Sequence, residues 1–307
     1  AWIRDNVYIA LCLEQIDEHL AVPTYHALLG VLKRHEWKLD EALRRKPTQS
    51  YFFVHPRYDP VDQTEVEGEW GNKQHDAVGL FLFAIGRAVS KGMSIIRSED
   101  DARILQKLIF YLDAVEYWKE PDNGIWENEE VLHASSIGAC VAGLQAMQKH
   151  LFVPQVLIER GEQALRKLLP QESALRETDL ALLSLIWPLN VVDSETAENI
   201  LKRVEDQLVR NKGVIRHVGD WYYAHPETQR EAEWPLGFAW LAMIYKQKGN
   251  AQKYRFYLRK LMDTLTEEGN VPELFYGSTN IPNQNTPLAW GQAIMLALSG
   301  DRENDRT

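Results

Sequence analysis

The sequence predicts an all-α protein built as an α/α toroid. Apolar residues recur at three- and four-residue spacing through most of the 307 residues, which is the period of an α-helix. Alternating patterns typical of strands are scarce, and the two extended candidates, 50–59 and 214–226, are short. Helices that are apolar nearly all round alternate with charged amphipathic helices, so we expect the first kind inside and the second outside.

The expected helices follow one another as helical hairpins. The apolar helices begin near Asp5, Gln74, Val131, Glu177, Glu231 and Asn285, and the amphipathic helices cover 24–45, 98–119, 154–169, 194–210 and 250–268. A repeat of one helical hairpin is typical of stacked helical architectures. We expect one catalytic domain over 1–299 and a charged tail over 300–307. The toroid lacks one outer helix, which we expect in an N-terminal segment before Ala1.

Composition and charge favour a neutral ligand. Hydrophobic residues at 45% suffice for a large core, and the net charge of −10 argues against nucleic acid and anionic membranes as partners. We see neither a membrane-spanning run nor a signal peptide, and Cys12 and Cys140 lie in apolar helical patterns typical of buried free thiols. A cytoplasmic location is expected, although the absence of an initial methionine leaves a signal peptide open.

The segments that enter the apolar helices are rich in Trp, Arg, Asp and Glu. If these helices line a toroid, their entering loops open at one end and form one pocket. Aromatic faces stack on sugar rings while polar side chains bond hydroxyls, so this composition predicts a carbohydrate site, although a single Trp near a helix start is more often core packing. Hydrolysis needs two carboxyls. Glu127 beside Trp126 suits the acid, because desolvation raises a carboxyl pKa, and Glu273 suits the base.

The order of these segments resembles a known family. "WIRDN" (2–6), "WGNKQHDA" (70–77), "GIWE" (124–127), "EWPLGFAWL" (233–241) and "VPELF…NTPLAWGQ" (271–292) are similar, in sequence order, to glycoside hydrolase family 15, the glucoamylases. They are also similar to the related domains of the phosphorylase kinase α and β subunits. The resemblance implies an (α/α)6 barrel that removes glucose from α-glucan ends with inversion.

The resemblance also implies roles for individual residues. Glu127 matches the general acid and Glu273 the general base. Substrate-binding positions are Trp2, Arg4, Asp5, Trp70, Gln74, Asp76, Trp126 and Arg216, with looser matches at Tyr222 and Glu233. The motifs "EWPL", "HASS" and "VPELF" look closer to the phosphorylase kinase branch, the starch-binding module of some glucoamylases is absent, and the loops are short for a glucoamylase.

Simpler interpretations stay open beside these roles. Glu129 and Glu130 are expected to be helix-start charges, and Glu273 has the alternative of a buried structural carboxylate. Asp5 has the alternative of a helix N-cap paired with Arg4. The nine histidines show no metal spacing, so we expect neither a metal nor another cofactor.

The predicted function is therefore an inverting, exo-acting α-glucosidase that acts on an α-linked glucose oligosaccharide or glucan. An inverting enzyme leaves room for water, so the two carboxyls should stand roughly 6.5–9.5 Å apart. The main alternative is a non-hydrolytic regulatory or sugar-sensing domain. A transferase or phosphorylase is a second alternative, but phosphorolysis needs a basic phosphate site that the loops lack. The sequence does not predict an oligomeric state.

Overall fold

The computed structural model describes residues 1–68 and 70–299, and within them it contains helices and isolated β-bridges but no strand. The predicted tail, 300–307, lies outside the described residues. The chain forms two compact units. Unit 1 comprises Ala1–Leu175 with Leu189–Val191, and unit 2 comprises Arg176–Pro188 and the residues from Val192 onward. The predicted single domain over 1–299 stays a prediction.

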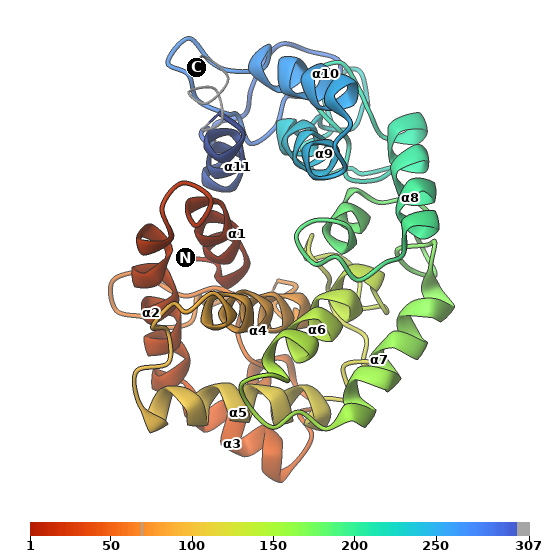
Figure 1. Ribbon diagram of the computed structural model, residues 1–307. Coiled ribbons are helices and arrows are strands. Elements are labelled where there is room, and N and C mark those ends of the chain that lie inside the picture. Colours follow the sequence, from red (N-terminus) through yellow and green to blue (C-terminus); the bar gives the residue numbers. More distant parts are fainter. Residues whose placement is uncertain (69, 300–307) are drawn as a thin grey trace. The chain divides into compact units, whose positions relative to one another are not determined.

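In unit 1 the apolar helices are packed together and the charged helices lie outside them (Figure 1). The apolar helices are α1 (Ile3–Leu13), α4 (His75–Ser90) and α6 (Ala134–Met147). The charged helices are α2 (Glu18–Arg34), α3 (Glu36–Arg44), α5 (Glu99–Ala114) and α7 (Gln155–Leu168). The predicted alternation is therefore present in this unit.

Helices α4 and α6 touch through their backbones. A Cβ atom added to Gly79 would lie 2.4 Å from the Ala139 carbonyl carbon, and one added to Gly143 would lie 2.4 Å from the Gly79 oxygen. Small residues permit this approach because side chains would otherwise hold the axes 8–10 Å apart. The pair forms the centre of unit 1.

The predicted outer helix over 24–45 is in fact two helices. Helix α2 begins earlier, after Asp17, whose carboxylate accepts a hydrogen bond from the His19 amide, and Pro23 lies inside the helix near its start. His35 leaves helical geometry between α2 and α3. Pro23 lies in the second turn of α2, so it removes the hydrogen bond that an amide at this position would donate to the His19 carbonyl.

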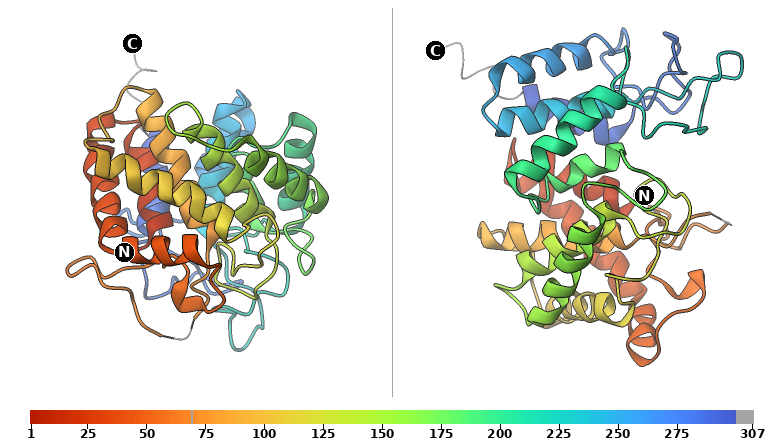
Figure 2. Two further views of the ribbon diagram at one scale, coloured as in Figure 1. Left: turned by 90° about the horizontal axis from the view of Figure 1, so that it is seen from below. Right: turned by 90° about the vertical axis from the view of Figure 1, so that its right-hand side faces the viewer.

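Unit 2 repeats the alternation with one exception. It contains η2 (Leu180–Leu185), α8 (Ser194–Gln207), α9 (Pro235–Gln247), α10 (Ala251–Met262) and α11 (Ala289–Ser299). Figure 2 shows α9 and α10 side by side in a second view. The prediction of an apolar α-helix near Glu177 is wrong, since this segment forms η2, a short 3-10 helix. Pro188 follows shortly, and a proline disfavours helical geometry in the residue before it.

The two extended candidates form no strand. Residues 50–59 contain a 3-10 turn, η1 (Ser50–Phe52), and bridges at Arg57 and Tyr58, while 214–226 contains only bridges at Val214. Both segments are short, and they pair with other segments only through these isolated bridges.

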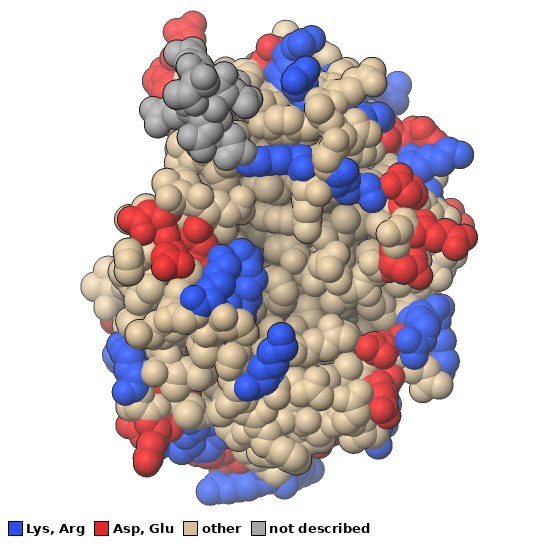
Figure 3. All heavy atoms as spheres, viewed as in Figure 1, with Lys and Arg blue, Asp and Glu red and all other residues tan. Residues whose placement is uncertain are grey.

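Other predicted features can be placed directly. Cys12 and Cys140 are buried free thiols, as predicted. Among the described residues no helix is long and apolar enough to span a membrane. On the face seen in Figure 3, Lys and Arg occur at separate places among Asp and Glu rather than in one basic field.

Candidate functional site

In unit 1 the loops before α1, α4 and α6 meet around Arg4. The Arg4 guanidinium donates through Nη1 to Gln74 Oε1 at 2.7 Å and to Asp76 Oδ2 at 3.1 Å. Its Nη2 lies 3.5 Å from Glu127 Oε1. Three residues from two segments that are far from Arg4 in the sequence therefore converge on this one cation.

Electrostatics keeps this arginine charged. Burial disfavours the Arg4 charge, but the carboxyls of Asp76, Asp5 and Glu127 outweigh it and raise the Arg4 pKa above its ordinary value. Asp5 lies within the first turn of α1, whose N-cap position belongs to Trp2, so the N-cap alternative for Asp5 is wrong. Burial raises the pKa of Asp5, and Arg4 opposes that shift.

Aromatic rings stand beside Arg4. Trp2 and Trp70 meet edge to face with centroids 5.1 Å apart, and His55 meets Trp70 in the same way at 5.1 Å. The guanidinium carbons of Arg4 and Arg57 lie 5.5 and 5.3 Å from the Trp2 ring. Sequence analysis missed Arg57 and His55, because neither belongs to a segment that enters an apolar helix.

Three buried polar atoms around Arg4 make no hydrogen bond to any described residue: Arg4 Nε, Trp70 Nε1 and Asp76 Oδ1. Unpaired buried donors and acceptors are rare in folded proteins. Their concentration here is what a site for a polar ligand or ordered water requires.

The segment carrying Glu127 is a tightly held loop. Glu127 has a φ of +58° and Gly124 one of +63°, and the Glu127 side chain is 35% exposed. The Asn123 amide donates to the Lys73 carbonyl at 2.8 Å, and Asn123 Nδ2 donates to the Asn128 carbonyl at 2.7 Å. A glutamate with left-handed backbone geometry is uncommon, so we infer that the surrounding hydrogen bonds hold Glu127 in this conformation.

Gly71 allows the Trp70 segment to approach this loop. A Cβ atom added to Gly71 would lie 2.8 Å from the Glu127 carbonyl oxygen and 2.9 Å from the Asn123 side chain. The close approach therefore requires glycine, and it couples the position of Trp70 to that of Glu127.

A buried aspartate ties the same loop to α4. Asp122 Oδ2 accepts from the His75 amide at 2.9 Å, and Oδ1 accepts from the Gly124 amide at 3.3 Å. Burial raises the pKa of Asp122 to about 6, against the opposing effect of His133. Burial also lowers the pKa of His75 to about 3, so this histidine is neutral.

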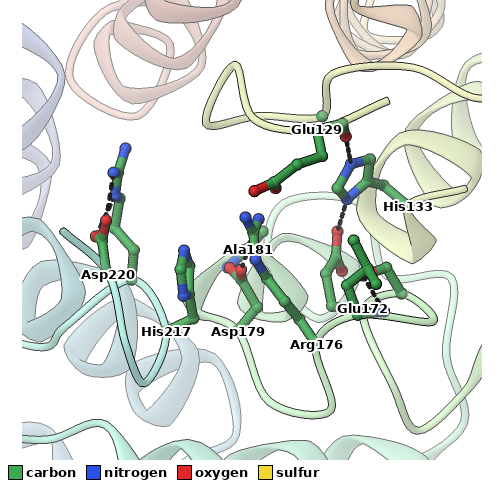
Figure 4. Close-up of polar contacts among 12 residues, drawn as sticks. Glu129, His133, Glu172, Arg176, Asp179, Ala181, His217 and Asp220 are labelled. Carbon is green, nitrogen blue, oxygen red and sulfur yellow. Dashed lines mark hydrogen bonds and ion pairs between the residues drawn. The ribbon is translucent and has the colours of Figure 1, made fainter. Parts of the chain in front are cut away.

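A second anchor lies at the other end of the loop. Figure 4 shows His133 between the Glu129 carbonyl, 3.4 Å from Nε2, and the Glu172 carboxylate, 3.3 Å from Nδ1. Glu172 also accepts from the amide and hydroxyl of Ser135 at 3.2 and 2.6 Å. Helix α6 begins only at Ala134, so Glu129 and Glu130 precede it rather than start it. Glu130 lies 3.4 Å from Lys73.

In unit 2 Arg216, which the resemblance implies as a sugar-binding residue, is paired with Asp220. Arg216 donates through Nε and Nη2 to Asp220 at 2.6 and 2.8 Å, and its guanidinium lies 4.6 Å from the Tyr222 ring. Tyr222 stacks on Trp234 with centroids 6.2 Å apart. Burial raises the pKa of Asp220, but Arg216 outweighs it, so the pKa stays below its ordinary value.

Glu273 is held by neutral amides. It is half-buried, and its Oε2 accepts from Asn285 Nδ2 at 2.9 Å and from Asn283 Nδ2. Amide donors stabilise a carboxylate without neutralising it. Neither Asn283 nor Asn285 was predicted to contact Glu273, although both lie in the segment 271–292 that resembles the family.

Glu233 has two backbone partners. Its Oε2 accepts from the Lys212 amide at 2.6 Å, its Oε1 accepts from the Ser278 amide at 2.9 Å, and the side chain is buried. These bonds tie three segments of unit 2 together. The resemblance implies that Glu233 binds the substrate, but both of its carboxylate oxygens already accept hydrogen bonds from backbone amides.

No group of three or more His, Cys, Asp or Glu residues within the described chain is arranged to hold a metal ion. The cluster around Arg4 consists of a cation, amides, carboxyls and indoles, which suits hydroxyl recognition better than metal coordination.

Comparisons with known proteins identify the family of this chain. A family model described as glycosyl hydrolases family 15 matches residues 1–296. The chain belongs to this family. A probable phosphorylase b kinase regulatory subunit alpha from Caenorhabditis elegans is 28% identical over 97% of this chain. The chain spans about 30% of the length of that family 15 relative.

Solved structures show the fold. A glycosidase variant in complex with glucose has a TM-score of 0.82 at 21% identity, covering 97% of this chain and 86% of its own. A bacterial glucoamylase complexed with acarbose has a TM-score of 0.72 at 16% identity, covering 99% and 49%. The predicted all-α (α/α)6 barrel of family 15 is thereby confirmed.

Proposed function

We propose that this chain is an inverting, exo-acting α-glucosidase that releases glucose from α-glucosides. The observation that carries the proposal is the convergence of Gln74, Asp76 and Glu127 on Arg4 beside two tryptophans. Such a cluster offers donors and acceptors to several hydroxyls of one terminal sugar. Glucose and acarbose in the two solved structures support a sugar of this class.

Glu127 is the proposed general acid and Glu273 the proposed general base. Glu127 is partly exposed at the tip of an anchored loop, where it could reach a glycosidic oxygen. Arg4 Nη2 lies 3.5 Å from Glu127 Oε1, and the Arg4 charge is already compensated by Asp76. Protonation of Glu127 then depends on water being excluded by the bound sugar beside Trp126.

Glu273 suits a base because two amide donors hold its carboxyl group in a fixed orientation. The mechanism requires a water between this carboxylate and the anomeric carbon, hence a separation from Glu127 of roughly 6.5–9.5 Å. Trp2, Asp5, Trp70, Gln74, Asp76, Trp126, Arg216 and Tyr222 are the proposed substrate-binding residues. Glu233 is proposed only as support for the loop that carries them.

The test is NMR of the anomer released from maltose, isomaltose and longer glucans. We expect β-glucose first from the wild-type protein, none above background from Glu127→Gln, and wild-type turnover from Glu130→Gln, a matched exposed glutamate of the same loop. Release of α-glucose first would contradict inversion. Full activity of Glu127→Gln would remove this residue from the mechanism.

The alternative is a non-hydrolytic sugar-sensing or regulatory domain. The names of relatives favour it, since the Caenorhabditis elegans protein is a phosphorylase b kinase regulatory subunit. Calorimetric titration with maltose decides between the two proposals: binding without turnover supports the regulatory domain, and absence of both binding and turnover contradicts each of them.

A further inference from the structure

A second pocket lies on unit 1 beside the candidate site, with which it shares His55. It has a volume of about 530 Å3 and lies between the start of α3, the η1 turn and residues 64–68 with Asn72. Among its lining residues are Trp37, Tyr51, His55 and Glu65. Its volume falls within the roughly 300–1,000 Å3 typical of small-molecule sites.

Two exposed aromatic rings form its most apolar wall. Trp37 is 40% exposed and Tyr51 is 58% exposed, and their centroids are 5.7 Å apart with an angle of 39° between the planes. Single exposed aromatics are ordinary, but two adjacent rings at the mouth of a pocket form a surface for stacking. The angle suits a ligand that bends from one ring to the next.

The buried ammonium group of Lys38 lies against both rings. Lys38 is 1% exposed, and its Nζ lies 4.6 Å from the Tyr51 ring centroid and 5.6 Å from that of Trp37. The same Nζ donates to the Phe53 carbonyl at 3.2 Å and to Glu65 Oε2 at 2.7 Å. The cation–π contacts order the two rings before any ligand arrives, which reduces the entropy lost on binding.

The rest of the lining is polar and acidic. His35, Thr64, Glu65, Glu67 and Asn72 supply donors and acceptors, while the Lys38 charge is compensated by Glu65. An anion is disfavoured here because Glu67 adds negative charge, and a purely apolar ligand would leave polar groups without partners. A neutral polyhydroxylated chain can stack on the two rings and exchange hydrogen bonds with the polar lining.

The pocket is joined to the Arg4 cluster by shared residues. His55 lines the pocket and also contacts Trp70 at 5.1 Å, and Gly68 and Asn72 belong to the loop that carries Trp70. We propose that the pocket bounded by Trp37 and Tyr51 is a second binding site for neutral α-glucan, which holds internal glucose units of a long chain. The choice of glucan rests on the substrate class of the proposed function.

Affinity electrophoresis in gels containing glycogen or amylose tests this site without requiring turnover. Trp37→Ala and Tyr51→Ala should each weaken retardation about three- to tenfold, the scale of one lost aromatic stacking contact. Phe152→Ala is the matched control, since this ring is 68% exposed but lies outside the pocket, and it should be retarded like the wild type. Maltose turnover or binding should be unchanged in all three variants, and thermal unfolding checks their folding.

The outcomes separate this inference from the proposed hydrolysis. Retardation lost in the Trp37 and Tyr51 variants supports the second site even where maltose is not cleaved. Retardation that survives both substitutions but is lost in Arg4→Ala would mean that glucan binds at the Arg4 cluster alone, and the inference would be wrong. A wild-type protein that is not retarded by glycogen or amylose would also contradict the inference of a second glucan site.

Discussion

Arg4 in unit 1 and Arg216 in unit 2 are both buried, yet they are held in different ways. Arg4 divides its guanidinium among Gln74, Asp76 and Glu127, and its Nε has no hydrogen-bond partner among the described residues. Arg216 directs two nitrogens to the single carboxylate of Asp220. A bidentate pair fixes geometry, whereas a shared guanidinium keeps donor capacity for a ligand.

The two carboxyl groups proposed for catalysis also differ in how their surroundings hold them. Glu127 lies at the tip of an anchored loop near a cation, while Glu273 accepts hydrogen bonds from two asparagines. We infer that the carboxyl of unit 1 adjusts to the bound sugar, whereas the carboxyl of unit 2 is already held in place by its two amide donors. Four predictions address this contrast.

The largest effect is expected at the two carboxyls. Glu127→Gln and Glu273→Gln should each lower kcat on maltose by about 10²–10⁴-fold, the usual contribution of general acid–base catalysis. α-Glucosyl fluoride separates them, because fluoride leaves without a proton. Only Glu127→Gln should recover near wild-type turnover on this substrate, measured as released fluoride. Recovery of both variants, or of Glu273→Gln alone, would reverse or abolish the assignment.

Gly71→Ala tests whether the geometry around Glu127 depends on the Trp70 segment. The added methyl would meet the Glu127 carbonyl at 2.8 Å, so the loop must shift, and kcat/KM should fall by about 10²-fold. The control is Gly30→Ala in helix α2, where nothing lies within 4 Å of the added Cβ. This control should keep full activity and gain about 0.5–1 kcal/mol of stability in urea unfolding. Equal activity of the two variants would contradict the predicted coupling.

Asp122 and Asp220 should give opposite dependences of stability on pH. The folded-state pKa of Asp122 is about 6, above the ordinary 3.8, so the folded state binds this proton more tightly. The wild type should therefore lose up to about 3 kcal/mol relative to Asp122→Asn as the pH rises from about 4 through 6. The folded-state pKa of Asp220 is lowered, so its contribution is present at neutral pH and is lost on acidification.

Urea unfolding measures this contrast when the wild type is compared with Asp122→Asn at about pH 4.5 and 7.5, and with Asp220→Asn at about pH 5 and 3, because the Asp220 contribution is lost only below its ordinary pKa of 3.8. The difference between the wild type and each variant should change with pH in opposite directions for the two aspartates. The same direction for both would show that Arg216 does not outweigh the effect of burial on the Asp220 pKa.

The smallest effects are expected from conservative changes of the arginines. Arg4→Lys should raise KM for maltose by about tenfold with little change in stability, because a lysine retains the charge but not the forked donors that hydroxyls would use. Arg216→Lys should instead cost about 1–2 kcal/mol in unfolding free energy, since the bidentate bonds to Asp220 are lost. Similar profiles for both variants would remove the proposed distinction between the units.

Much of the architecture could be predicted because it depends on local patterns. The spacing of apolar residues indicates α4 and α6, and the small residues at Gly79 and Gly143 are consistent with their close contact. Local patterns failed where a few residues changed the outcome. The segment near Glu177 has the composition of a helix but forms the short η2, and the outer helix predicted over 24–45 divides at His35.

The sequence by itself determined the helical class, the alternation of helices, the family and the identity of Glu127 and Glu273 as candidate carboxyls. These follow from periodicity and from residue types in order along the chain. Only the tertiary structure brought Gln74 and Asp76 to Arg4, Gly71 against the Glu127 backbone, and Lys38 beneath Trp37 and Tyr51. Hydrogen bonds, burial and charge compensation depend on distances between residues remote in the sequence, and periodicity contains no information about those distances.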